Sequence, residues 1–435
     1  MSSAAQLRTA APPGAAAGRS RGGGRRRPGI PTLLRVLVVL VVAVLPLYLP
    51  GSLLQTGLFC MSAIIGAIGL NLLTGNTGQL SLAHAFFLAV GAYGYSYFAG
   101  KPSRVGGGIS ASGLELPTVL AAVLAVLIAG FFGLLFSPIS SRLRGIYLGI
   151  ASLALVFIGQ HILFNAESIT GGFNGRNIPP FNLFGFSFDA TDPQLFILNV
   201  SFGRFERLWY LGLALVVLSY LFAKNLLRGR PGWAMQMVRD SEIAAAVMGV
   251  DVRRYKASAF VLSSMYAGLA GVLFALTFSR IVPDTFGFDL SVQFLAMIII
   301  GGLGSVGGAA LGAVLVIALP QLLSQYGSSV PYLAAPGSGG VDAGSFARYV
   351  FGAAIIGFLI FESGGLAAIG RRLAQAITRR RPRRPERATT SVAPDAPHPT
   401  GSDRATGPRT PQAPPPAPEP QVCTDPAPPS GTGPS

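Results

Sequence analysis

Charged residues, cysteines and histidines are all scarce in this chain of 435 residues. Only 11% of the residues are charged, against roughly a quarter in an ordinary soluble domain, whereas 51% are hydrophobic. The two cysteines are too few for a disulfide framework, and the three histidines are too few for a metal-dependent hydrolase. These scarcities argue against a soluble globular enzyme.

The chain does contain apolar runs of about 17 to 21 residues, the length needed to cross a bilayer core of roughly 30 Å. The run 290–320 is too long for one ordinary span and glycines interrupt it, so it is either a broken pair that enters and returns or two short spans. The sequence predicts an all-α polytopic membrane protein with about 8–10 transmembrane helices, including broken or re-entrant segments. The runs are 33–49, 53–73, 80–99, 117–136, 145–164, 209–227, 257–277, 290–320 and 346–362.

The two ends of the chain have a different composition from the body. Residues 1–32 are basic, and residues 366–435 are rich in arginine and proline with few large apolar side chains. Such segments cannot bury enough apolar surface to offset the entropy of folding, so we expect both tails to be disordered. The transmembrane permease domain is then 33–365. Beside membrane spans, a basic tail faces anionic lipid, and no nucleic acid is expected as a partner.

Basic residues also predict the orientation in the membrane. If both tails, residues 137–144 and residues 224–256 face the cytoplasm, that side holds 26 of the 33 basic residues. The chain is therefore expected to span a bacterial plasma membrane many times with both termini cytoplasmic. The one sizeable outer loop, 165–208, is expected to be ordered but partly non-helical, as a docking or lid element or as a passive connection.

A polar, glycine-rich segment at 74–79 interrupts the apolar pattern. Backbone that leaves its helix at membrane depth is tolerated only where protein covers it or where it lines a wet cavity, and broken helices hold anionic groups in transporters. Ser81 is a candidate cap for the following helix. The alternative is a plain surface loop with His84 hydrogen-bonded inside the bundle. The candidate translocation-pathway residues are Asn71, Thr74, Asn76, Thr77, Gln79, Ser81 and His84.

The expected cytoplasmic loop 228–256 contains apolar positions that alternate with charges. Its pattern predicts one short amphipathic helix after a Pro-Gly turn, closed by Gly249. Such a helix could lie on the membrane surface or project into a groove of a cytoplasmic partner. The apolar positions are Trp233, Met237, Ala244, Ala245 and Met248, and the charged ones are Arg239, Asp240 and Glu242.

A third informative segment is the glycine block 301–312. Gly304, Gly308 and Gly312 recur every four residues, which predicts a face of small residues where helix backbones approach closely. Packing is the interpretation that this spacing favours, and a constriction of the pathway is the alternative.

Four blocks in this order resemble the permease subunits of branched-chain amino-acid ABC importers, specifically the LivM kind, over roughly residues 35 to 365. The blocks are Gly-Leu-Asn71-Leu-Leu-Thr-Gly75-x-Thr77-Gly78-Gln79-Leu-Ser81-Leu-x-His84; Arg144-Gly-Ile-Tyr-Leu with Ser168-Ile-Thr170-Gly171-Gly172; Glu242-Ile-Ala-Ala-x-x-Met-Gly249-Val-x-Val-x-Arg-Tyr255-Lys256; and Ile300-Gly-Gly-Leu-Gly-Ser305.

The resemblance implies a transport subunit that is not itself an enzyme. It implies four kinds of partner: a second permease of the LivH kind, two cytoplasmic ATPases, an external solute-binding protein and the lipid bilayer. No cofactor is expected on this chain, because it contains no Walker G-x-x-x-x-G-K-[ST] loop; ATP and magnesium would bind the ATPases. The residues similar to an ATPase-coupling helix are Arg239, Asp240, Glu242, Ala244, Ala245 and Gly249, although Ile243 separates the glutamate from the alanines.

Two alternatives remain at this point. Similar permeases are associated with urea, short amides and other amino acids, because specificity rests largely with the external binding protein. An ion-coupled secondary transporter would belong to another class, and it would usually carry a buried acid or an acid–histidine relay. Away from its edges the apolar body is nearly free of acids, which counts against this class.

Overall fold

The computed structural model describes residues 30–105, 109–143, 145–183, 186–188, 196–197, 200–201 and 203–326, with short pieces at 349, 352–353, 356–357 and 365–367. Apart from a few positions, both predicted tails and the last apolar run, 346–362, lie outside these residues, as does Arg144.

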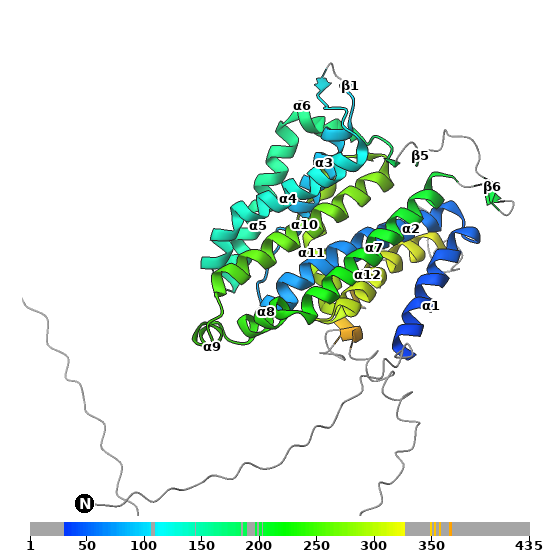
Figure 1. Cartoon of the computed structure of the whole chain (residues 1–435). Helices are drawn as coiled ribbons and strands as arrows, with labels where there is room; N and C mark the ends of the chain where they lie inside the picture. The colour runs from blue at the N-terminus through cyan, green and yellow to red at the C-terminus, as the bar shows by residue number, and fades with distance from the viewer. Residues whose placement is uncertain are drawn as a thin grey trace, which may run out of the picture. The chain divides into compact units, whose positions relative to one another are not determined.

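Within the described residues the chain is almost entirely helical, and its long helices coincide with the apolar runs (Figure 1). Five helical stretches are long and apolar enough to cross a membrane: 51–75, 118–142, 146–165, 204–228 and 252–278. The predicted all-α polytopic membrane protein is therefore confirmed. The helices of the bundle are α1 (Ile30–Val44), α2 (Gly51–Leu70), α3 (His84–Ala99), α4 (Thr118–Arg142), α5 (Ile146–Asn165), α7 (Arg204–Arg228), α10 (Val252–Phe278), α11 (Phe288–Gly301) and α12 (Val306–Tyr326).

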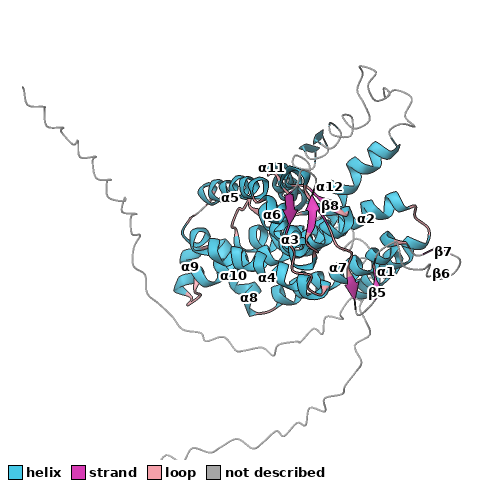
Figure 2. Ribbon diagram, turned by 90° about the horizontal axis from the view of Figure 1, so that it is seen from above, coloured by secondary structure: helices cyan, strands magenta, loops and turns pink. Residues whose placement is uncertain are grey.

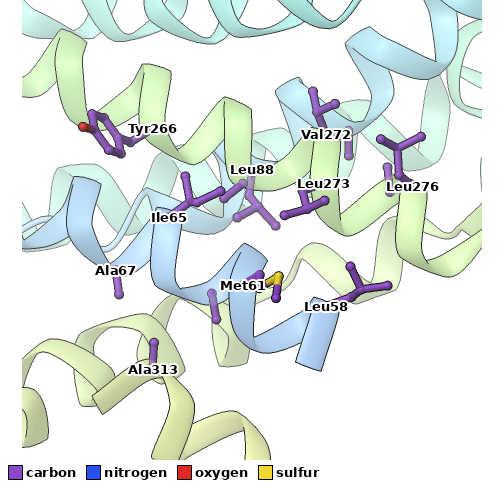
Figure 3. Packing of buried hydrophobic residues seen from close by; sticks show 14 of the residues in the cluster. Leu58, Met61, Ile65, Ala67, Leu88, Tyr266, Val272, Leu273, Leu276 and Ala313 are labelled. Atoms are coloured by element: carbon purple, nitrogen blue, oxygen red, sulfur yellow. The ribbon is translucent and has the colours of Figure 1, made fainter. Parts of the chain in front are cut away.

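Helix α10 makes its most extensive contacts with α4, α3 and α2. Small residues allow its backbone to approach α3 closely: a Cβ atom on Gly91 would lie 2.2 Å from the carbonyl oxygen of Gly268. Around this crossing, large apolar side chains fill the space between the helices, among them Ile65 of α2, Leu88 of α3 and Leu273 of α10 (Figure 3). Small residues set the spacing of the helices, and aliphatic side chains fill the interior between them.

Short antiparallel strand pairs lie at the end of the bundle that carries residues 165–183. We call this the outer end, after its predicted orientation, and the opposite end, which carries the loop 229–251, the inner end. The pair β3 (Arg176–Asn177) and β8 (Arg280–Ile281) joins the loop after α5 to the segment after α10 (Figure 2). The other pairs are β1 (Ser103–Val105) with β2 (Ile109–Ala111), β4 (Asn182–Leu183) with β5 (Phe186–Ser187), and β6 (Phe196–Ile197) with β7 (Val200–Ser201). The short helix α6 (Glu167–Thr170) and the 3-10 turn Gly172–Asn174 complete this end.

Arg176 anchors the outer loop to the bundle. Its side chain is buried, and its Nη1 atom donates a hydrogen bond of 2.8 Å to the carbonyl oxygen of Ile169. Burial lowers the pKa of this guanidinium from its ordinary value. Over its described residues, the loop 165–208 contains a short helix, a 3-10 turn and short strands, in agreement with the prediction of an ordered, partly non-helical loop.

The long apolar run 290–320 forms two antiparallel helices, α11 and α12, joined at residues 302–305. Gly301 faces Gly308, and a Cβ atom on Gly312 would lie 2.0 Å from the carbonyl oxygen of Met297. The prediction that Gly304 shares this face is wrong: Gly304 lies in the turn, with a φ of 81° that favours glycine. The four-residue spacing holds for Gly308 and Gly312, but Gly304 precedes the first residue of α12, Val306.

Candidate functional site

The predicted break between α2 and α3 is present and is built from two kinds of backbone. Helix α2 ends in a π-helical turn, Asn71–Gly75, and the chain is then non-helical from Gly78 to Ala83. A π-helical turn changes the hydrogen-bonding register of a helix and is frequent at functional sites. Six of the seven pathway candidates are buried, and Thr74 is half-buried.

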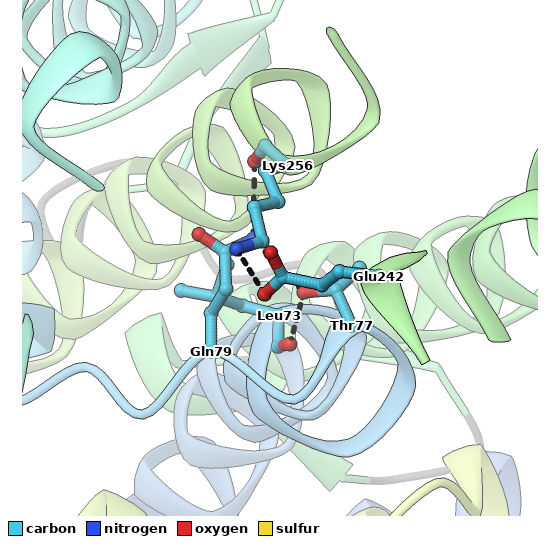
Figure 4. A network of polar contacts seen from close by, with 5 residues as sticks. All are labelled: Leu73, Thr77, Gln79, Glu242 and Lys256. Atoms are coloured by element: carbon cyan, nitrogen blue, oxygen red, sulfur yellow. Dashed lines mark hydrogen bonds and ion pairs between the residues drawn. The ribbon is translucent and has the colours of Figure 1, made fainter. Parts of the chain in front are cut away.

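Polar side chains of the break satisfy much of its backbone. The hydroxyl of Thr77 donates to the carbonyl oxygen of Leu73 at 2.6 Å (Figure 4). The amide of Asn76 donates to the carbonyl oxygen of Asn71 at 3.1 Å, and the hydroxyl of Thr74 donates to that of Gln79 at 3.0 Å. These residues therefore stabilise the break in the packed bundle, as buried non-helical backbone requires.

Three buried polar atoms in this region have no hydrogen-bond partner among the described residues: Asn71 Nδ2, Gln79 Oε1 and His84 Nε2. Buried polar groups are usually paired, so an unpaired one requires an explanation, such as a functional role or a bound water molecule. His84 packs against Phe294 of α11, with 4.6 Å between the ring centroids. The imidazole also interacts with the backbone of Gly66, as expected from the alternative that His84 is hydrogen-bonded inside the bundle.

The expectation that Ser81 caps the next helix is wrong. Helix α3 begins at His84, and the hydroxyl of Ser81 accepts a hydrogen bond of 3.3 Å from the amide of Ala83, before the helix starts. The amide of Ala85 in the first turn donates instead to the hydroxyl of Ser291, 3.1 Å away on α11. The polar group that satisfies this helix start thus comes from an element 206 residues further along the chain.

The two glycine-rich breaks contact each other. The amide of Gly304, in the turn between α11 and α12, donates a hydrogen bond of 2.9 Å to Oδ1 of Asn71. A Cβ atom on Gly75 would lie 2.4 Å from the same amide nitrogen, so glycine is required for the approach. Sequence reasoning identified both segments but not their contact, because nothing in either pattern specifies the other as its neighbour.

The loop between α7 and α10 consists of two helices, and the prediction of a single helix is wrong. Helix α8 (Arg230–Asp240) is followed by Ser241. The hydroxyl of Ser241 accepts a hydrogen bond from the amide of Ala244 and caps the start of α9 (Glu242–Val247). A serine at this position favours a new helix over continuation of the old one. Gly249, with a φ of 80°, follows α9 as predicted.

The apolar side chains of this loop divide into two sets. Ala234, Met235, Val238 and Ala245 are buried against the bundle. The second set, which we call the exposed apolar surface of the loop, comprises Trp233, Ile243, Val247 and Met248, with exposed fractions of 67%, 76%, 81% and 73%. Of the predicted apolar positions, Ala244 is exposed and Met237 is half-buried. The loop therefore packs on the bundle with one side and presents large apolar residues on the other.

Two charged contacts hold this loop to the break. Arg239 donates through Nη1 to the carbonyl oxygen of Gly75 at 2.5 Å. Glu242 forms an ion pair of 2.5 Å with Lys256 of α10, and Gln79 donates to the backbone carbonyl of Lys256 at 3.2 Å (Figure 4). The side chain of Asp240 is exposed.

Lys256 and Ser291 were not predicted from the sequence as candidate site residues. A lysine near the start of an apolar helix is a signal that could have identified Lys256.

Among the described residues, no group of histidine, cysteine, aspartate and glutamate side chains could hold a metal ion. The structure instead places two helix breaks in contact at one end of a bundle of apolar helices, with an amphipathic two-helix loop held against them. This combination defines a multi-pass membrane transport subunit.

The chain belongs to the family described as the permease component of the branched-chain amino acid transport system, which it matches over residues 52–364. It is 33% identical over 307 residues to the high-affinity branched-chain amino acid permease LivM of Escherichia coli, covering 67% of this chain and 68% of that protein. It is 27% identical to a probable LivM of Methanocaldococcus jannaschii, covering 49% and 58%, and 24% identical to LivH of Salmonella typhimurium, covering 60% and 81%.

This membership makes the chain a permease subunit of an ABC importer and not an enzyme. It confirms the resemblance to the LivM kind that the four sequence blocks indicated. The ion-coupled secondary transporter is thereby excluded as a class. No solved structure matches the chain.

Proposed function

We propose that this chain translocates branched-chain amino acids that an external solute-binding protein delivers to its outer end. The choice of substrate is supported by the 33% identity, over two thirds of the chain, to the LivM permease of Escherichia coli, which is named as a branched-chain amino acid permease. Urea, short amides or other amino acids are the second candidates, because permeases similar in sequence are associated with them. The subunit would pair with a LivH-like permease.

Two cytoplasmic ATPases would bind ATP and magnesium, and one of them would dock on α8 and α9. The exposed apolar surface of the loop supports this assignment, because four large apolar side chains on two short adjoining helices are costly to leave in water. Hydrophobic residues surrounded by charges, here Arg239, Asp240 and Glu242, are typical of a helix that inserts into a groove. Ala244 is exposed beside them, whereas Ala245 faces the bundle and Gly249 ends the element.

Movement of this loop would reach the translocation pathway through its two charged contacts. Arg239 contacts Gly75, and the pair Glu242–Lys256 adjoins Gln79, so both links end at the break between α2 and α3. Since Gly304 is bonded to Asn71, the α11–α12 turn is included in the same unit. Closure of the ATPases would thus bias both breaks together between two arrangements.

The experiment that tests the function is uptake into proteoliposomes. The complex would contain this chain, its partner permease, the ATPases and the binding protein, and labelled leucine and labelled urea would be compared with and without ATP. ATP-dependent uptake of leucine is expected. Uptake of urea but not leucine would overturn the substrate while leaving the importer mechanism, and uptake of leucine that ignored ATP would contradict the proposed role of the ATPases.

A further inference from the structure

A cavity of about 330 Å³ lies in the outer half of the bundle, among α2, α10, α11, α12 and the 3-10 turn Pro283–Phe286. Its volume falls within the range of small-molecule sites, about 300–1,000 Å³. None of the seven pathway candidates of the break lines it. The cavity is therefore lined by residues other than the polar residues of the break.

One wall of the cavity is aromatic. Phe59 of α2 and two residues of α10, Phe274 and Phe278, stack on one another with ring centroids 4.5 to 5.7 Å apart. Rings arranged in this way offer a large apolar surface at a small cost in side-chain entropy, because each has only two rotatable bonds. This wall fits the apolar part of a ligand.

The facing wall is polar and acidic. Asp289 and Gln293 are one turn apart on the same face of α11, and Asp284 projects from the preceding turn. No ion pair of either aspartate is present among the described residues, and Arg280 nearby is bonded to the backbone of Asn174. Asp284 and Asp289 are exposed, and two carboxylates without a basic partner attract a cationic group.

The floor of the cavity leads toward the break. Ser62 and Ala63 of α2 line the cavity, and one turn further along this helix, Gly66 lies against both Phe294 and Nε2 of His84. Phe294 is itself part of the cavity lining and is buried. Nε2 of His84 thus lies just beneath the floor, beside Gly66 and between the cavity and the π-helical turn of α2.

We propose that this cavity binds a single free amino acid with an apolar side chain during its passage through the subunit; the proposal rests on the proposed function. Asp284 and Asp289 bind the α-ammonium group, the side-chain amide of Gln293 donates to the α-carboxylate, and the phenylalanine wall contacts the apolar side chain. Phe294 closes the floor above His84. Urea has neither a charge nor an apolar part, so it could donate hydrogen bonds to the carboxylates but would leave the phenylalanine wall unused.

Protection of an introduced cysteine tests this site directly and without the binding protein. In the permease–ATPase complex, with Cys60 and Cys423 replaced by alanine, Thr285→Cys is labelled with a water-soluble maleimide; Thr285 lines the cavity and has no contact with the ligand in the proposal. Leucine and isopentylamine, which both carry the ammonium group and the branched chain, are expected to slow labelling several-fold. 4-Methylpentanoate, which lacks the ammonium group, is expected to have no effect. Leu114→Cys, at an exposed position outside the cavity, is the reference whose labelling leucine does not change.

A matched pair of variants separates ligand binding from helix stabilisation. Asp289 lies in the first turn of α11, where any acid interacts favourably with the helix N-terminus, and Glu206 lies in the first turn of α7, away from the cavity. Asp289→Asn is expected to abolish protection by leucine, whereas Glu206→Gln is expected to preserve it.

If the wild-type complex takes up leucine with ATP but leucine leaves the labelling of Thr285→Cys unchanged, the cavity assignment is wrong and the proposed function stands. Equal loss of protection in both acid variants would also overturn the assignment, because it would reflect a general effect on helix starts. Failure of the wild-type complex to take up leucine would instead contradict the proposed function and the inference with it.

Discussion

Lys256 is a charged residue whose side chain is only 4% exposed, near the inner end of α10. Removing an ammonium group from water is costly unless a charged partner compensates, and here Glu242 does so at 2.5 Å. The carboxylate is 29% exposed, so the pair has one buried and one partly solvated member. The charge pair therefore acts together with the buried side chain of Ala245 to hold α9 on the bundle.

We predict that Lys256→Met and Glu242→Gln each weaken the coupling of ATP hydrolysis to uptake. Loss of either partner should cost about 2 kcal/mol, between the values for exposed and for buried pairs, and should release α9 from α10. The measurement is the ratio of leucine uptake to ATP hydrolysis in proteoliposomes, which should fall while hydrolysis continues. The exchanged pair, Glu242→Lys with Lys256→Glu, should recover part of the ratio.

Asp240 provides the control for this prediction, because it is a neighbouring acid whose side chain is exposed. Asp240→Asn should leave the transport ratio close to that of the wild type. If this variant and Glu242→Gln reduce the ratio equally, the effect comes from the net charge of the loop and not from the ion pair.

Ser291 supplies the second residue-scale prediction. Its buried hydroxyl accepts the amide of Ala85, so Ser291→Ala leaves a donor in the first turn of α3 without its partner. The expected cost is about 1–2 kcal/mol, seen as a decrease in Tm of about 2–4 °C for the detergent-solubilised complex. Ser291→Thr should restore most of the stability. Ser258→Ala, which removes an exposed hydroxyl bonded within its own helix, should change Tm little.

At the scale of elements, α11 and α12 depend on a close backbone approach. We predict that Gly312→Ala destabilises this pair by about 1–3 kcal/mol or more, because its Cβ atom would overlap the carbonyl oxygen of Met297. Gly307→Ala, in the same helix, meets nothing within 4 Å and should be neutral or slightly stabilising. Thermal unfolding of the two variants checks this. Equal stability of both would show that α12 packs differently.

Most helices could be predicted from the sequence, because an apolar run of fixed length has few other solutions in a bilayer. The same reasoning identified the breaks at 74–79 and at 301–308, where glycine and polar residues interrupt those runs. It failed at Ser81 and at Ser241, where several local hydrogen-bond arrangements are possible and tertiary contacts decide among them. Local patterns specify an element more reliably than they specify where it begins.

The site was only partly predictable for a related reason. The polar residues of the break were identified, but the hydrogen bond between Gly304 and Asn71 joins positions 233 residues apart. No periodicity reports such a contact. Lys256 was counted among the basic residues of the loop, and its burial depends on the packing of α10 against the break.

At the scale of the whole molecule, the distribution of basic residues predicts the side of the membrane on which each end lies. With cytoplasmic termini, Cys423 in the C-terminal tail should react with a membrane-impermeant thiol reagent in inverted vesicles but not in intact cells. Leu114→Cys, in the loop before α4, should show the opposite behaviour. Cys60 is buried in the bundle and should contribute little labelling from either side. Labelling of Cys423 in intact cells would reverse the orientation.

The hydrogen bond between Asn71 and Gly304 also has a consequence for biogenesis. The ribosome releases the break between α2 and α3 long before it synthesises Ser291 and Gly304, the residues that complete it. Until α11 and α12 insert, the first turn of α3 and the amide side chain of Asn71 lack these partners. The N-terminal half of this subunit is therefore an obligatory, incompletely satisfied insertion intermediate, and membrane-protein quality control should recognise chains that stop before residue 288.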